Sequence, residues 1–170
     1  NLLIGFIGGF LIGVAGAFFT EFVGDTINLP EDVERKLNLS LLGLMPRSDK
    51  GTHLTEAAAE PKSEVAEAAN SLRTALQFAT THGAPRSILL SSSRPAEGKS
   101  SVSFALAIAF ARQGRKVLLV DADMRRPTFY TGVTSRDDED GLSNVLTGQS
   151  QGQLPIRKTG ITNLSLMTAG

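Results

Sequence analysis

The stretch SSSRPAEGKSS, residues 91–101, constrains the fold of this chain more than any other. An apolar run at residues 88–90 precedes it and predicts a strand. An alanine-rich segment, residues 101–112, follows it, ends at Gly114 and predicts a helix. In a strand-loop-helix turn, the backbone N–H groups of the loop and the helix N-terminus converge on one point, which stabilises a polyphosphate. The stretch therefore predicts a phosphate-binding loop.

The last residues of this loop carry its chemistry. Gly98 lets the backbone approach a phosphate closely, Lys99 neutralises the β- and γ-phosphates, and the Ser100 hydroxyl can ligate Mg²⁺. The loop is irregular at one position, because Ser93 stands where the standard pattern has its first glycine. The predicted nucleotide-binding residues are Ser93, Arg94, Pro95, Ala96, Glu97, Gly98, Lys99, Ser100 and Ser101.

Two carboxylates follow the next apolar run. Residues 116–120 predict a strand of the kind that is buried on both faces of a parallel sheet, and residues 86–121 have the length of one strand-helix-strand crossover. Because parallel strands place their carboxyl ends on one edge, Asp121 and Asp123 should emerge beside the loop. With Ser100 they predict a Mg²⁺ site and the activation of an attacking hydroxyl. A polar cap on a strand end is the alternative.

Arg125 and Arg126 come directly after these aspartates. Arginines near a nucleotide stabilise transferring charge, pair with carboxylates or contact a neighbouring subunit. The sequence leaves these three roles open.

Composition excludes several classes of function. The 170 residues carry 17 Lys and Arg against 17 Asp and Glu, so no net positive field favours nucleic acid as a partner. Cysteine is absent, which excludes disulfides and cysteine-ligated metal. His53 and His82 lie in polar, loop-like sequence and are expected on the surface without a role.

The N-terminal segment is apolar. Residues 2–19 carry no charge and approach the roughly 20 residues that cross a bilayer, so we expect a transmembrane helix over residues 1–20. A signal peptide fits poorly because no basic region precedes the run, and the glycines would weaken a buried helix of a soluble protein. Gly5, Gly9 and Gly13 predict a small-residue face for helix packing.

Residues 21–60 are expected to form a juxtamembrane segment and linker. A short helix should start at Pro30 and reach Leu37. Residues 41–46 suggest a short buried strand that ends at a proline, and residues 47–61 suggest a linker. Local charge gives little orientation signal, but a nucleotide site belongs where ATP is, so the chain after residue 19 is expected in the cytoplasm.

Residues 61–170 are expected to form the first part of a nucleotide domain, with a helix over residues 63–80. The exposed side of this helix should carry Glu64, Glu67, Asn70 and Arg73, either as a solvated face or as a partner surface. Further on, the sequence predicts an exposed acidic loop at residues 131–140, a short helix at residues 141–146 and a strand at residues 164–167.

These motifs together resemble the bacterial tyrosine kinases that are fused to polysaccharide co-polymerases and act in capsule and exopolysaccharide export. The resemblance covers nearly the whole chain and rests on segments that occur in the family's order. They are the glycine-bearing apolar helix with DTI at residues 25–27 and LGLMP at 42–46, the helix segment EAANSLRT at 67–74, the Walker A loop at 92–101 and VLLVDADMRRP at 117–127.

The resemblance implies an α/β fold, a P-loop NTPase-type parallel sheet with flanking helices, incomplete here, after one transmembrane helix. It implies a non-specific protein-tyrosine kinase in the inner (plasma) membrane with a cytoplasmic nucleotide domain. Lys99 and Ser100 would hold MgATP, and Asp121 and Asp123 would organise the metal and the attacking tyrosine hydroxyl, with Lys99 and both aspartates catalytic. Glu67 and Arg73 would join subunits into a homo-oligomeric ring. The partners would be the polysaccharide polymerase and export machinery and a cognate phosphatase.

The chain departs from the family pattern in four respects. Ala96 replaces a glycine of the loop, and Asn70 stands where the family has an arginine. The Walker B strand and the tyrosine cluster would lie beyond Gly170, and Tyr130 is the single tyrosine and not an expected target. We therefore expect a fragment that is inactive alone.

Two other functions are alternatives to a tyrosine kinase. A non-catalytic ATP-binding regulator of polysaccharide chain length is the alternative. A membrane-tethered partitioning ATPase is disfavoured, because those proteins carry an additional lysine early in the loop, where this chain has Ser92-Ser93-Arg94.

Overall fold

The computed structural model describes residues 2–23, 30–47, 58–129, 140–150 and 152–170. The chain divides into two compact units, residues 1–41 and residues 42–170, which are described separately here. The predicted linker at 47–61, the predicted acidic loop at 131–140 and Tyr130 lie largely or wholly outside the described residues.

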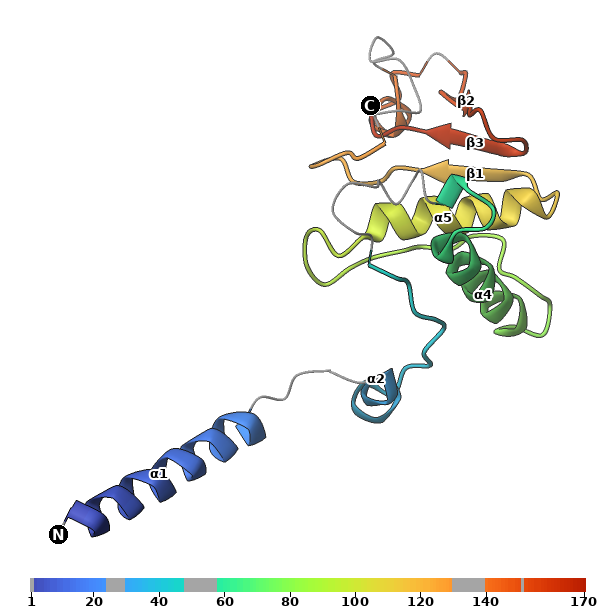
Figure 1. The fold of residues 1–170 in the computed structure, drawn as a ribbon. Helices are drawn as coiled ribbons and strands as arrows, with labels where there is room; N and C mark the ends of the chain where they lie inside the picture. The colour runs from blue at the N-terminus through green and yellow to red at the C-terminus, as the bar shows by residue number, and fades with distance from the viewer. Residues whose placement is uncertain (1, 24–29, 48–57, 130–139, 151) are drawn as a thin grey trace. The chain divides into compact units, whose positions relative to one another are not determined.

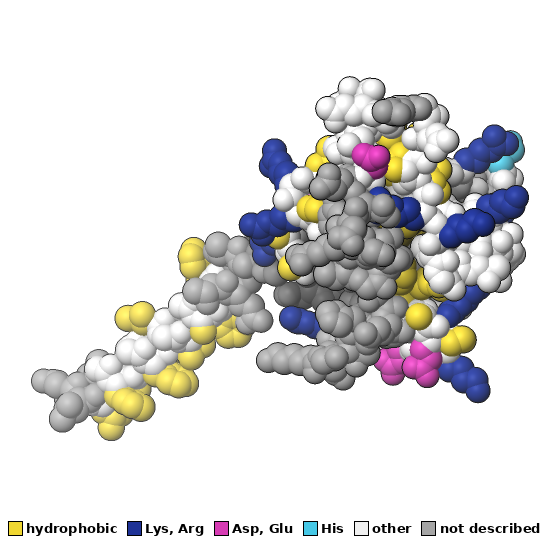
Figure 2. Space-filling model, turned by 90° about the horizontal axis from the view of Figure 1, so that it is seen from above, with side chains coloured by type: hydrophobic (Ala, Val, Ile, Leu, Met, Phe, Trp, Pro, Cys, Tyr) yellow, Lys and Arg dark blue, Asp and Glu magenta, His cyan; other side chains and the backbone are white. Residues whose placement is uncertain are grey.

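The first unit holds helix α1 (Leu2–Val23) and helix α2 (Pro30–Leu37). Among the described residues, no helix has both the length and the apolarity needed to cross a bilayer. The prediction of a transmembrane helix over residues 1–20 is therefore not confirmed. Figure 2 shows hydrophobic side chains along the length of α1. The exposed apolar residues of α1 are Leu3, Phe6, Ile7, Phe10, Leu11, Ile12, Val14, Phe18 and Phe19.

Helix α2 carries oppositely charged residues at its two ends. Glu31 and Asp32 lie in its first turn, Arg35 and Lys36 in its last, and each pair complements the helix dipole. The Arg35 guanidinium lies 3.3 Å from the Asp32 carboxylate, one turn away. The predicted helix over residues 30–37 is confirmed.

Two packed helices cover a small sheet in the second unit (Figure 1). Helix α5 (Lys99–Arg112) lies between the sheet and helix α4 (Glu64–Phe78), so all eight residues from Phe104 to Ala111 are buried. The apolar face of α4 packs on α5 through Val65, Ala69 and Leu76. Ser63 caps α4, because its hydroxyl accepts a hydrogen bond of 3.1 Å from the Ala66 N–H.

The sheet has three strands in the order β1-β3-β2. Strands β1 (Val117–Val120) and β3 (Leu164–Met167) were predicted and pair in parallel, with Val117 opposite Leu164. Strand β2 (Arg157–Lys158) pairs with β3 antiparallel, so the sheet is mixed and not purely parallel as expected. Helix α6 (Leu142–Leu146) confirms the predicted short helix and is tied to the end of β3 by a Leu142 N–H to Thr168 carbonyl bond of 2.8 Å.

Three strand predictions need correction. Residues 88–90 form no strand, and Leu89 is 88% exposed. Residues 41–46 also have no regular structure, although Met45 packs against the core. Strand β1 is not buried on both faces, because Leu118 and Val120 are 44% and 40% exposed. At residues 88–90 and 41–46 the sequence is apolar as noted, but a strand also needs a hydrogen-bonded neighbour, which an apolar run does not specify.

Candidate nucleotide site

The loop before α5 is held in shape by its own side chains. The Glu97 carboxylate accepts hydrogen bonds from the Arg94 N–H at 3.0 Å and from the Ser93 hydroxyl at 3.2 Å. The Ser92 hydroxyl donates to the Arg94 carbonyl at 3.0 Å. Glu97 therefore closes a tight turn, which is a role that the sequence pattern alone did not assign to it.

Two residues of this loop adopt positive φ. Gly98 has φ +84° and begins α5 as its N-cap, with no side chain bonded to the first helical N–H groups. The N-terminus of a helix without a side-chain cap leaves donors available to an anion. Ala96 has φ +62°, in the left-handed region that favours glycine.

We predict that Ala96→Gly will raise the free energy of unfolding by about 0.5–1 kcal/mol, because a left-handed backbone is costly for alanine and free of strain for glycine. Ala96 is exposed, so little packing is lost. The matched control is Gly98→Ala, where an added Cβ meets no atom within 4 Å and only the backbone is strained, and it should be destabilising. Urea denaturation of both variants measures the difference, and an unchanged or lower value for Ala96→Gly would contradict the prediction.

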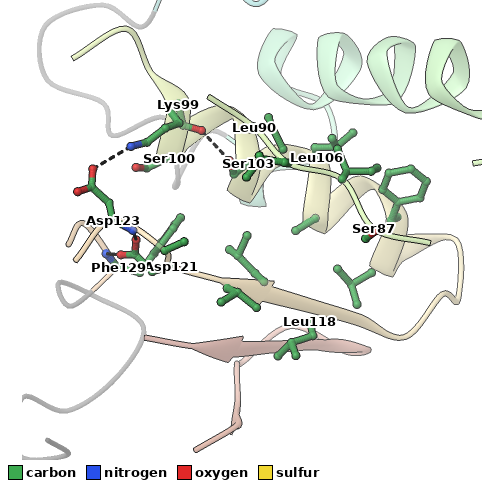
Figure 3. Close-up of a pocket in the computed structure, with 18 of the residues that line it drawn as sticks. Ser87, Leu90, Lys99, Ser100, Ser103, Leu106, Leu118, Asp121, Asp123 and Phe129 are labelled. Carbon is green, nitrogen blue, oxygen red and sulfur yellow. Dashed lines mark hydrogen bonds and ion pairs between the residues drawn. The ribbon is translucent and has the colours of Figure 1, made fainter. Parts of the chain in front are cut away.

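The predicted site residues converge at the end of β1 (Figure 3). The Lys99 ammonium lies 2.8 Å from the Asp123 carboxylate, which joins the loop to the segment after β1 across 24 positions of sequence. Both side chains are about one-third exposed, at 32% and 29%. Ser100 is partly buried in the first turn of α5, and its hydroxyl donates to the Thr128 hydroxyl at 3.1 Å. The predicted juxtaposition of the loop with the two aspartates is therefore confirmed.

The two aspartates differ in their surroundings. Asp121 is 4% exposed, and its carboxylate accepts hydrogen bonds from three backbone N–H groups of the turn that follows. One oxygen accepts from Asp123 at 3.0 Å, and the other from Thr128 at 3.0 Å and Phe129 at 3.4 Å. Asp121 thus organises residues 121–129, while Asp123 presents its carboxylate to Lys99.

A buried aromatic contact fixes the far end of this turn. Phe129 is 6% exposed, and its ring packs on Phe104 of α5 with a centroid distance of 6.1 Å. Sequence reasoning missed both Thr128 and Phe129. The sequence signal that could have indicated them is the change from a polar to an aromatic residue after Pro127, because Thr128 faces the site and Phe129 faces the core. Arg125 and Arg126 are exposed, and the Arg126 N–H donates to Asp123 at 3.1 Å.

The pKa of Asp123 is lowered from its ordinary value, first by the hydrogen bond from Lys99 and then by the Arg126 N–H. Its favourable contribution to stability is therefore present above the pKa of an unfolded aspartate, about 3.9, and is lost as the pH falls through the lower folded-state pKa. We predict that Lys99→Met will raise the pKa of Asp123 in an NMR titration of the carboxyl carbons. Glu97 is the internal control, because its pKa is lowered first by the Arg94 N–H and should not move. An unchanged Asp123 titration would contradict the prediction.

A cavity of about 1260 Å³ extends from this cluster between residues 85–91, α5 and β1. Its two ends differ in chemistry, as Figure 3 shows. Lys99, Ser100, Asp121 and Asp123 lie at one end, and Leu90, Leu106 and Leu118 line the other part. The polar end combines a cation, hydroxyl and carboxylate oxygens and a helix N-terminus, which suits a phosphate with a hard cation.

The oxygen donors of this end fit Mg²⁺, which usually takes one or two carboxylates, phosphate oxygens and waters. Ser100 and Asp123 are the residues that would hold it. Within the described part of the chain, no group of three or more histidine, aspartate or glutamate side chains forms a separate metal site.

Comparison with known proteins places this site in a family. The profile of the AAA domain matches residues 86–170, half of the chain, and includes the loop and both aspartates. The chain belongs to the AAA domain family. The chain is also similar to bacterial tyrosine-protein kinases and to solved tyrosine-kinase domains.

The tyrosine-protein kinase YwqD of Bacillus subtilis is 35% identical over 127 residues, which is 73% of this chain and 53% of that kinase. The solved BceF tyrosine kinase domain is 34% identical with a TM-score of 0.70, over 85% of this chain and 62% of that domain. The kinase domain of the Escherichia coli tyrosine kinase ETK is 29% identical with a TM-score of 0.70, over 85% and 61%. The AAA domain protein thus spans about half the length of the Bacillus kinase.

Proposed function

We propose that this chain is part of an ATP-dependent, autophosphorylating protein-tyrosine kinase. The observation that carries the proposal is the 2.8 Å contact between Lys99 and Asp123, because it brings the loop and the carboxylates after β1 into one site. The tyrosine-kinase names of the relatives support the choice of acceptor, since a P-loop site by itself does not specify which hydroxyl is phosphorylated.

Each residue has a distinct task in this proposal. Lys99 and the uncapped N-terminus of α5 bind the β- and γ-phosphates. Ser100 and Asp123 hold Mg²⁺, which, when bound, neutralises negative charge on the phosphates. Asp123, whose carboxylate is partly exposed, also lies where it can accept the proton of an attacking tyrosine hydroxyl. Asp121 keeps the turn that carries Asp123 in place through its three backbone hydrogen bonds.

The test is phosphorylation by the full-length protein. Incubation with ATP and Mg²⁺ should produce phosphotyrosine, detected by mass spectrometry, and EDTA should prevent it. Phosphotyrosine that never forms, although labelled ATP binds, would overturn the kinase proposal and leave the alternative.

That alternative is a non-catalytic ATP-binding regulator of polysaccharide chain length. One observation favours it: Asp121 is 4% exposed and its carboxylate accepts three backbone N–H groups, so Asp123, which is 29% exposed, is the more accessible carboxylate of the pair. A single carboxylate is sufficient for binding MgATP, whereas a kinase also needs to deprotonate its acceptor.

The cellular role, the location and the partners of the whole protein are also proposals. We propose a polysaccharide co-polymerase at the inner membrane, with the nucleotide domain in the cytoplasm, acting with the polymerase and export machinery and a cognate phosphatase. Its support is the family resemblance and the exposed apolar surface of α1. A homo-oligomeric ring through Glu67 and Arg73 is supported by the exposure of Glu67 on α4, while Arg73 is partly buried and donates to Gln77 at 3.2 Å.

A further inference from the structure

The Ser100 hydroxyl can act as a ligand to Mg²⁺ only when one of its oxygen lone pairs faces the cation. Its proton must then point elsewhere, toward an acceptor. In the structure that acceptor is Thr128, because the Ser100 O–H donates to Thr128 Oγ1 at 3.1 Å. The Thr128 hydroxyl has its own proton directed at the Arg126 carbonyl, at 3.4 Å. This relay leaves Thr128 Oγ1 as an acceptor toward Ser100.

The position of Thr128 is fixed independently of its hydroxyl. Its backbone N–H donates to the buried Asp121 carboxylate at 3.0 Å, and the next residue, Phe129, packs on Phe104 of α5. The Thr128 hydroxyl is therefore held beside Ser100 by the backbone hydrogen bond to Asp121 and by the packing of Phe129. A side-chain substitution at position 128 leaves both contacts in place. Position 128 lies 28 residues from Ser100 in sequence, which explains why no local motif predicted the pair.

From this geometry we propose that Thr128 is a positioning residue, which orients the Ser100 hydroxyl so that its lone pair faces the metal. The inference rests on the proposed nucleotide function of the same site and adds a residue to it. Thr128 contacts neither phosphate nor metal in this proposal and acts through Ser100. Partners of this kind behind a metal ligand typically change metal affinity about 10–100-fold when they are replaced.

The test uses Thr128→Val in the full chain, because valine keeps the branched shape and the backbone N–H but lacks the acceptor. The probe is N-methylanthraniloyl-ADP, whose fluorescence is titrated with Mg²⁺ and, separately, in EDTA. We expect the Mg²⁺ concentration for half-maximal enhancement of binding to rise about tenfold, with no change in EDTA. Thr128→Ser should restore the wild-type Mg²⁺ dependence.

A double-variant cycle distinguishes a role through Ser100 from a general effect on the turn. Ser100→Ala removes the ligand itself, so adding Thr128→Val to Ser100→Ala should cause no further change. Three results would overturn the inference: a wild-type Mg²⁺ dependence in Thr128→Val, an equal loss of affinity in EDTA, or full additivity in the double variant. If the wild-type chain binds no nucleotide, the proposed function fails as well, whereas normal binding with an insensitive Thr128→Val removes only this inference.

Discussion

Replacing Asp121 with alanine is expected to lower the free energy of unfolding by about 2–4 kcal/mol, because an unsatisfied buried donor costs about 1–3 kcal/mol. Asp121 is buried, and its carboxylate is the acceptor for the N–H groups of Asp123, Thr128 and Phe129. Alanine provides no acceptor, and these donors would be left without a partner wherever water cannot reach them. Denaturant unfolding monitored by circular dichroism measures the change.

Asp123→Ala is the matched control, since it removes the same chemical group two residues away. Asp123 is 29% exposed and its main partner is the similarly exposed Lys99, so water screens the pair and its loss should destabilise the fold much less. A loss of stability in Asp121→Ala no greater than in Asp123→Ala would show that the buried carboxylate does not hold the turn. Asp121→Asn, which retains one oxygen acceptor, should fall between wild type and Asp121→Ala.

The second large effect concerns ligand binding. Lys99→Met is expected to weaken the binding of a fluorescent ATP analogue about 10- to 150-fold, because a hydrogen bond between charged partners contributes about 1.5–3 kcal/mol. In the full-length protein the same substitution should abolish autophosphorylation. Methionine keeps the length and apolar character of the lysine stem, so the change isolates the charge.

Lys158→Met in β2 is the control, since Lys158 is an exposed lysine on a different part of the sheet and away from the cavity lining. It should bind the analogue as wild type does. Retained binding and phosphorylation in Lys99→Met would contradict the kinase proposal, and equal losses in both variants would point to a nonspecific charge effect.

Much of the fold could be predicted from local pattern. The helices were predicted because helical period and the residues of a first turn are read within a few positions, as over residues 63–80 and at Pro30. The prediction of a strand at residues 88–90 was wrong, because three consecutive apolar residues indicate burial but not which neighbour would supply the hydrogen bonds. The antiparallel strand β2 was missed for the converse reason, since Arg157-Lys158 has no apolar signal at all.

The site likewise divides into features that local sequence predicts and features that depend on distant contacts. Lys99, Ser100, Asp121 and Asp123 could be predicted, since residue type and position relative to a strand end carry the signal. The different roles of the two aspartates could not, because they depend on how residues 124–129 fold back over Asp121. Thr128 and Phe129 were missed because their positions depend on a contact with Phe104, which is formed only when the turn packs on α5.

The ion pair between Lys99 and Asp123 makes the protein's own carboxylate a competitor of its ligand. A phosphate that approaches Lys99 from the side that Asp123 occupies has to displace this carboxylate, and its affinity is then reduced by the free energy of breaking the ion pair. A metal that takes Asp123 would remove this competition, which couples the two ligands thermodynamically without any movement of the backbone. Affinity for the nucleotide and the stability of the ligand-free pair therefore oppose each other at this position.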